Sequence, residues 1–311
     1  MPSPGFATKR LTRLAEPNST LGIVLTLWYE LGMSRLALIA VLASHLLHAQ
    51  VAAEWQRWVD AGTSAFSAGN YTEAANAFQK AAYLDANDPA TKLYLGAAYM
   101  SAWLKERASN RDSAVQAEEQ FRHALILQPE NDKALLWLGS LMLQLQRLDE
   151  AESIYSKAAA LVHNERAVSD ANYAMGIIIW SRWYVSYSAA RRKLGMATSD
   201  SGLLPDSDLA KELRNRYGDL IQEGIDRLRS VLSREKGYTN AAAYLGLLYR
   251  QRAAISEDRK QYLVNLRIAE DVEADCGPEA AELRSKLETS PALVPPALPA
   301  LVFLTANEPV K

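Results

Sequence analysis

One spacing of glycine, alanine and aromatic residues recurs along the chain and restricts its fold more than any other feature. In residues 132–165, Gly139 is followed twelve residues later by Ala151, then by Tyr155 and Ala158 at steps of four and three. The same intervals occur earlier in the chain, at Gly62, Ala74, Phe78 and Ala81. Steps of three and four residues place side chains on one face of a helix. The spacing therefore predicts repeated pairs of short helices joined by tight turns.

The composition agrees with a long, folded, helical chain. Of its 311 residues, 49% are hydrophobic and 23% are charged, as in folded proteins. Between residues 18 and 277 the only prolines are Pro89, Pro129 and Pro205, which favours helices. The net charge of −2 provides no general basic field, so we expect no nucleic-acid partner. Because Cys276 is the single cysteine, an internal disulfide and a thiolate metal cluster are excluded.

The glycine of the pattern sets the register of the repeats. It occurs at Gly62, Gly96, Gly139, Gly176 and Gly246. The first interval is 34 residues, and the later ones lengthen to 43, 37 and 70. Together with Leu95, Tyr99, Phe121 and Pro129, this pattern resembles the 34-residue tetratricopeptide (TPR) repeat over residues 55–272.

This resemblance implies an all-α TPR superhelix, or α-solenoid, of about five helix-turn-helix repeats, with a 36-residue helical insertion in the fourth. We expect an N-terminal extension and signal peptide in residues 1–53, the TPR array in 54–275, and a capping helix with a Pro-rich flexible tail in 276–311. Segments such as YAMGIIIW and RRKLGM resemble exported TPR proteins of Acidobacteria-like bacteria, a group without an assigned activity. That resemblance implies export but no particular function.

The N-terminal region has the pattern of a secretory signal. Arg35 precedes the apolar run Leu36–Leu47, and small residues at 51–53 suit signal peptidase, which predicts cleavage before Glu54. We therefore expect Met33 to be the true start and the protein to be exported to the periplasm or envelope. One alternative is an uncleaved inner-membrane anchor over residues 21–47, although charges at 30 and 35 interrupt that span. The other alternative is a cytosolic chain.

The insertion after Ile179 begins with an aromatic stripe. Trp180, Trp183, Tyr184 and Tyr187 share one helical face, and cations at 191–193 suit the end of that helix. We expect a loop after Gly195 and a new helix capped by Ser207 or Asp208. The aromatic face either packs the insertion against the body or contacts a partner. Exposed side chains would favour the partner, and buried ones would favour packing.

No residue pattern predicts chemistry. His123 and His163 have no zinc-site spacing, and no phosphate-binding loop or nucleophile elbow occurs. The acidic run that includes Glu270, Glu273 and Asp275 is typical of a solvated helix face. We therefore predict no catalytic residues, no metal and no cofactor. An enzyme with a site in the insertion, residues 180–223, is the third class of function to consider.

In a TPR stack, the second, fifth, ninth and twelfth positions of each unit face a concave groove. The predicted partner groove comprises Phe66, Leu93, Met100, Lys133, Leu136, Leu143, Tyr173, Ile177 and Trp180. Only Lys133 resembles the carboxylate clamp of chaperone-binding TPR proteins, so an apolar or amphipathic peptide segment fits this lining better. The sequence thus predicts a non-catalytic interaction scaffold with a protein or peptide partner. The alternative is a membrane-anchored assembly or secretion factor that uses the same groove, with membrane contact only through the N-terminal segment.

Overall fold

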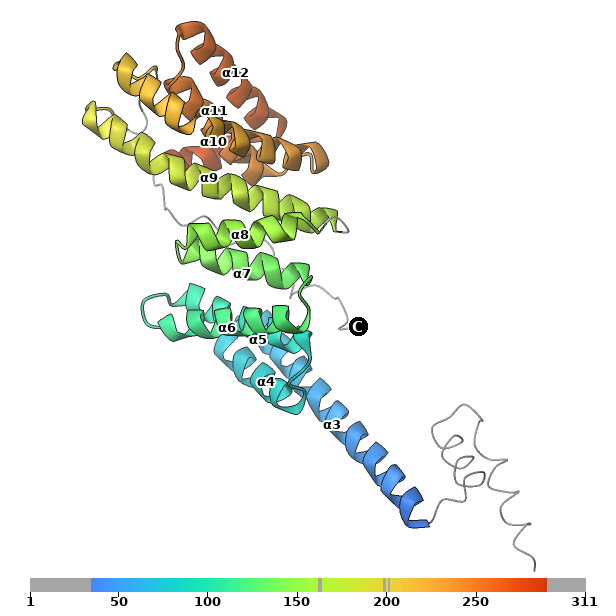
Figure 1. Ribbon diagram of the computed structural model, residues 1–311. Coiled ribbons are helices and arrows are strands. Elements are labelled where there is room, and N and C mark those ends of the chain that lie inside the picture. The colour runs from blue at the N-terminus through green and yellow to red at the C-terminus, as the bar shows by residue number, and fades with distance from the viewer. Residues whose placement is uncertain (1–34, 162–163, 198–199, 201, 290–311) are drawn as a thin grey trace, which may run out of the picture.

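The computed structural model of the chain describes residues 35–161, 164–197, 200 and 202–289. These residues form eleven helices and no strand, and the helices stack into an elongated array (Figure 1). In chain order the helices are α3 (Arg35–Ser67), α4 (Tyr71–Leu84), α5 (Pro89–Lys105), α6 (Arg111–Leu127), α7 (Asp132–Gln144), α8 (Leu148–Ala159), α9 (Glu165–Lys193), α10 (Ser207–Arg234), α11 (Thr239–Ala254), α12 (Arg259–Asp275) and α13 (Pro278–Thr289).

Neighbouring helices pair along the stack. Each odd-numbered helix from α3 to α11 packs against the even-numbered helix that follows it, and each pair packs against the next. The helices α5, α7, α9 and α11 also contact one another in sequence, so the odd-numbered helices form one row, called here the first-helix row. Helix α13 closes the stack by packing on α11 and α12. The expected all-α TPR superhelix is confirmed.

The recurring spacing within a pair has a steric cause, which Gly96 illustrates. A Cβ atom built on Gly96 would lie 2.6 Å from the ring of Phe121, which is fully buried on α6. Real Cβ atoms do not approach other atoms so closely, and therefore only glycine lets α5 and α6 pack at this distance. The recurring glycine, alanine and aromatic residues thus mark helix pairs in close contact, as predicted.

The insertion in the fourth unit lengthens both helices of that pair. Helix α9 has 29 residues and α10 has 28, whereas α7 and α8 have 13 and 12. The aromatic stripe lies on the added part of α9, which projects beyond the neighbouring helices (Figure 1). The cap of α10 is Asp206, whose carboxylate accepts hydrogen bonds from the backbone N–H groups of Asp208 and Leu209. The predicted caps, Ser207 and Asp208, were therefore wrong by one and two residues.

The N-terminal part of α3 extends away from the stack (Figure 1). Residues 43–54 are exposed, and within the described part of α3 burial begins only at Val59. No helix in the described part of the chain is long and apolar enough to cross a membrane. The predictions for residues 1–34, which include Met33 as the start, and for the tail 290–311 lie outside the described residues.

Candidate functional site

The predicted groove residues all lie on the first-helix row, but most are enclosed. Lys133 is exposed, whereas the other eight side chains have exposed fractions of 5% or less. These eight are Phe66, Leu93, Met100, Leu136, Leu143, Tyr173, Ile177 and Trp180. They therefore do not present the open apolar lining that the sequence predicted. Around α9 the reason is aromatic packing, since the ring of Tyr173 lies 5.1 Å from Tyr238 and 6.1 Å from Tyr244.

The aromatic stripe of α9 packs the lengthened helix against its neighbours. The ring of Trp183 lies 5.1 Å from Tyr217 on α10, and the ring of Trp180 lies 5.3 Å from Tyr244 on α11. Both tryptophans are fully buried, so the packing interpretation is favoured for them and partner contact is not. Edge-to-face and tilted ring pairs of this kind add about 0.5–1.5 kcal/mol each beyond burial of their area.

The two tyrosines of the aromatic stripe also line a cavity. Together with Trp180, Tyr184 and Tyr187 line a cavity of about 360 Å³ between the end of α9 and helices α11, α12 and α13. We call it the C-terminal cavity. Its other walls come from Arg191, Asp200, Gly202, Leu247, Arg250, Gln251, Ala254, Tyr262, Leu266, Glu270, Arg284, Leu287 and Glu288. Because Leu247 and Arg250 occupy groove positions of the fifth unit, the cavity continues the concave side of the first-helix row.

A buried guanidinium holds one wall of the cavity. Arg191, one of the cations expected at the end of this helix, is only 1% exposed. Its Nε donates to the carbonyl of Ala197 at 2.9 Å, its Nη2 to the carbonyl of Asp200 at 2.7 Å, and its Nη1 to the hydroxyl of Tyr187 at 3.0 Å. Arg191 therefore fixes the chain after α9 over the cavity. Arg191 follows Tyr187 by four residues, which places it on the aromatic face of the helix. This spacing could have predicted that Arg191 is buried.

A buried carboxylate links the remaining helices around the cavity. Glu273 on α12 is 4% exposed and pairs with Arg250 of α11 at 3.2 Å and with Arg284 of α13 at 3.3 Å. The prediction that the acidic run is a solvated face is thus wrong for Glu273. A Cβ on Gly246 would collide with Oε1 of Glu273, so the missing side chain of Gly246 makes room for this carboxylate. The charge network ties α11, α12 and α13 together.

The cavity wall combines apolar and polar groups that suit a peptide. The Nε1 of Trp180 and the Oε1 of Gln251 are buried and make no hydrogen bond within the described structure. Burial raises the pKa of Tyr187, and the nearby Arg191 only partly offsets this, so the phenol stays protonated and neutral at physiological pH. Three arginines face three carboxylates among the lining residues, which favours a ligand with little net charge.

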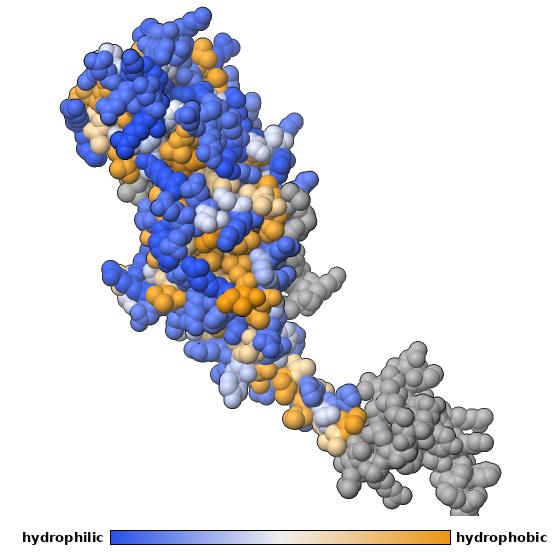
Figure 2. Space-filling model, in the orientation of Figure 1, coloured by the Kyte–Doolittle hydropathy of each residue, from blue (hydrophilic) through white to orange (hydrophobic). Residues whose placement is uncertain are grey.

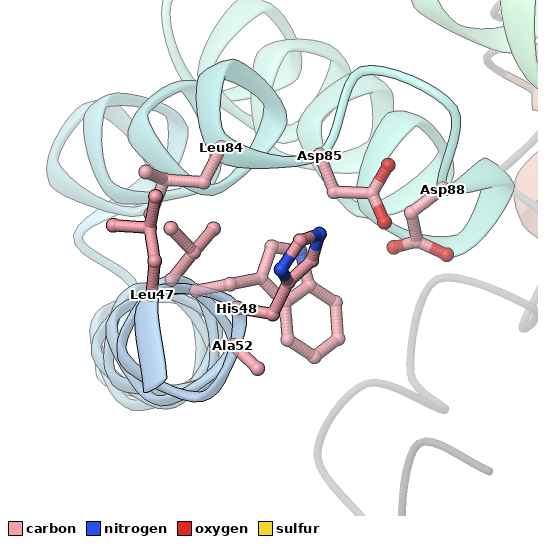
Figure 3. Close-up of a pocket in the computed structure, with 8 residues that line it drawn as sticks. Leu47, His48, Ala52, Leu84, Asp85 and Asp88 are labelled. Atoms are coloured by element: carbon pink, nitrogen blue, oxygen red, sulfur yellow. The ribbon is translucent and has the colours of Figure 1, made fainter. Parts of the chain in front are cut away.

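A second hollow lies at the opposite end of the stack. It measures about 730 Å³ and lies between the exposed part of α3 and the loop after α4 (Figure 3). Leu47 of α3 lies opposite Leu84, and His48 projects toward the side where Asp85 and Asp88 form the polar rim. The surface seen in Figure 2 is mainly hydrophilic, with hydrophobic patches over the middle of the stack and on the free end of α3. Leu46 and Leu47 contribute there, with exposed fractions of 67% and 60%.

Within the described residues, no three His, Cys, Asp or Glu side chains are arranged to hold a metal ion. The model of the tetratricopeptide repeat family matches residues 112–171, which run from the start of α6 into α9. The chain contains a TPR repeat there.

Two solved structures align with most of this chain. A crystal structure of MamA aligns at 19% identity with a TM-score of 0.45, covering 68% of this chain and 94% of MamA. The crystal structure of YrrB, described as a TPR protein with an unusual peptide-binding site, aligns at 17% identity with a TM-score of 0.45, covering 73% and 90%. A search of the curated proteins finds no match.

Proposed function

We propose that this protein is a non-catalytic interaction scaffold that binds an apolar or amphipathic peptide segment along the concave side of its first-helix row. The observation that carries this proposal is the C-terminal cavity, where groove positions of α9 and α11 meet an enclosed space of about 360 Å³. Aromatic walls supply apolar contact area, and the arginines and carboxylates of the lining supply polar contacts. Sites for small groups commonly combine a mainly apolar lining with a few placed polar atoms.

The cavity would accept one side chain of a bound segment together with its peptide group. The volume is at the low end of ligand sites, so it suits a residue rather than a folded domain. The balanced charges of the wall disfavour a strongly acidic or basic segment, because an unpaired buried charge is costly. We therefore expect peptides selected on this protein to be apolar or amphipathic and nearly neutral.

Peptide selection from a displayed random library, followed by affinity measurements, tests this function. The informative variant is Tyr184→Ala, since Tyr184 stacks on Trp180 with ring centroids 5.1 Å apart and faces the cavity. Its matched control is Val185→Ala on the same helix, because Val185 is 55% exposed and lies outside the cavity lining. We expect Tyr184→Ala to weaken binding about tenfold, or about 1.4 kcal/mol, and Val185→Ala to leave it unchanged. Failure to select any peptide, or equal effects of both variants, would refute the proposed site.

We also propose that the protein is exported to the periplasm or envelope after cleavage before Glu54. The exposure of residues 43–54 supports this, because a chain that starts at Glu54 keeps the packed part of α3, including Val59. The alternative, an anchored assembly or secretion factor, draws support from the continuation of α3 to Arg35 and from the hollow beside Leu47. Sequencing the mature N-terminus separates the two: cleavage predicts Glu54, and a start at Met1 or Met33 contradicts it.

A further inference from the structure

After its first two residues, helix α7 is buried on every side, which is unexpected for a helix that should present an open groove face. Each residue from Ala134 to Gln144 is buried, including Leu136 and Leu143 at groove positions, with exposed fractions of 5% and 2%. The described helices that pack on α7 are α5, α6, α8 and α9. Helices α5 and α9 flank it in the first-helix row, and α6 and α8 belong to the second helices of the pairs. These contacts account for the two flanks of α7 and for the side toward the second helices, which leaves the groove face that bears Leu136 and Leu143.

The end of α13 directs the chain toward that face. Arg284, Leu287 and Glu288, in the last turns of α13, line the C-terminal cavity together with Trp180 and Leu247 of the first-helix row. Helix α13 ends at Thr289, so its last described turns lie on the groove side of the stack.

The composition of the tail suits a covering segment better than a solvated one. The 22 residues from 290 to 311 carry charges only at Glu308 and Lys311, and they include the apolar run Leu301–Leu304. Solvated tails are usually polar, because water does not favour exposed apolar side chains. The prolines at 291, 295, 296, 299 and 309 favour an extended conformation that loses little entropy on binding.

The C-terminal segment is also long enough to reach α7 from the end of α13. An extended segment of 22 residues at about 3.1 Å per residue spans roughly 68 Å. From α11 to α5 there are three helix-to-helix spacings of about 8–10 Å, or roughly 30 Å in total. Residues 290–304 therefore suffice to run from the C-terminal cavity to α7 and α5.

We propose that the C-terminal segment, residues 290–311, binds in cis along the groove of the first-helix row, with Leu301–Leu304 covering Leu136 and Leu143 of α7. This inference rests on the proposed peptide-binding function and specifies its ligand. The segment is the protein's own occupant of the site, and a partner must displace it. The partner segment is accordingly extended, apolar, proline-containing and nearly uncharged, like the tail itself.

The test uses the full chain and a fluorescent peptide with the sequence of residues 290–311. In the parent, the tethered tail competes with the peptide, since tethering supplies a high effective concentration. The variant Leu301→Asp/Leu304→Asp weakens the tail's apolar contact and should bind the peptide at least tenfold more tightly than the parent does. The control Ser290→Asp/Asn307→Asp adds the same charge outside the apolar run and should behave like the parent.

Two further variants locate the binding surface. Leu136→Glu, placed in the tail variant, should abolish peptide binding, whereas Ile126→Glu on the 74% exposed face of α6 should not. Thermal melts followed by circular dichroism confirm that both proteins are folded. As an independent readout, a photo-crosslinking residue at position 303 of the otherwise unchanged chain should react with α5 or α7 of the same molecule. Adducts located on other helices would overturn the proposal.

The outcomes separate this inference from the proposed function. Equal peptide binding by the parent and the tail variant would show that the tail does not occupy the groove, and would overturn the inference. If library-selected peptides bind in a Tyr184-dependent manner while the tail peptide binds neither protein, the inference fails and the proposed function stands. If neither kind of peptide binds, both fail.

Discussion

The glycine at the contact between paired helices makes the most quantitative prediction. In Gly96→Leu, the new Cβ would lie 2.6 Å from the Phe121 ring, and Phe121 has no room to move because it is fully buried. Overpacking of this kind costs about 1–3 kcal/mol. Replacing a helical glycine returns about 0.5–1 kcal/mol through backbone entropy. We therefore expect a net loss of roughly 1–2 kcal/mol in the free energy of unfolding.

The assay is a thermal melt and a urea titration, with Gly218→Leu as the matched control. Gly218 also lies inside a helix, α10, but a Cβ there meets no atom within 4 Å. The control should raise stability slightly while Gly96→Leu lowers it. In a Phe121→Ala background the loss caused by Gly96→Leu should shrink, because the clashing ring is gone. An equal effect of the two glycine substitutions, or a loss unchanged in the Phe121→Ala background, would refute this steric explanation.

Three other predictions concern buried charges. Burial raises the pKa of Asp170 above its ordinary value of 3.8, more than the pairing with Arg166 lowers it. Its stabilising contribution is therefore fully present below pH 3.8 and is lost as the pH rises through the folded-state pKa, so the melting temperature of the parent should fall relative to that of Asp170→Asn as the pH rises above 3.8. A difference between the two melting temperatures that stays constant as the pH rises contradicts the prediction. Glu273→Gln should cost about 3 kcal/mol, because two half-buried arginines lose their buried carboxylate partner. The exposed Asp271→Asn should cost little in the same denaturation assay, and equal losses would argue against the network. Arg191→Gln should speed proteolysis within residues 197–205, measured by mass spectrometry of timed digests, and a parent-like digestion rate would show that Arg191 does not restrain this segment.

Local spacing predicted the fold well because the decisive contacts lie within one repeat. Gly96 and Phe121 meet inside a single helix pair, so their interval appears directly in the sequence. The aromatic spacing from Trp180 to Tyr187 likewise predicted a helix with one aromatic face. These features depend on helical periodicity alone, which a sequence displays.

The candidate site was less predictable because its contacts join distant segments. In the sequence, Glu273 does not differ from the other acidic residues around it. Only the packing of three helices places Arg250 and Arg284 beside it. The predicted groove residues lie on the first-helix row, but their burial depends on neighbours such as Tyr238 and Tyr244, which the repeat pattern does not specify. Sequence periodicity predicts which face a residue is on and leaves open what covers that face.

The most direct measurement of the proposed scaffold function maps where a bound peptide lies. A library-selected peptide with a photoreactive group is crosslinked to the full chain, and the adducts are located by mass spectrometry. Binding at the proposed site predicts adducts on the cavity residues Tyr184, Leu247 and Leu287. Adducts confined to the exposed residues Val115 and Ile126 of α6, on the second helices, would contradict it.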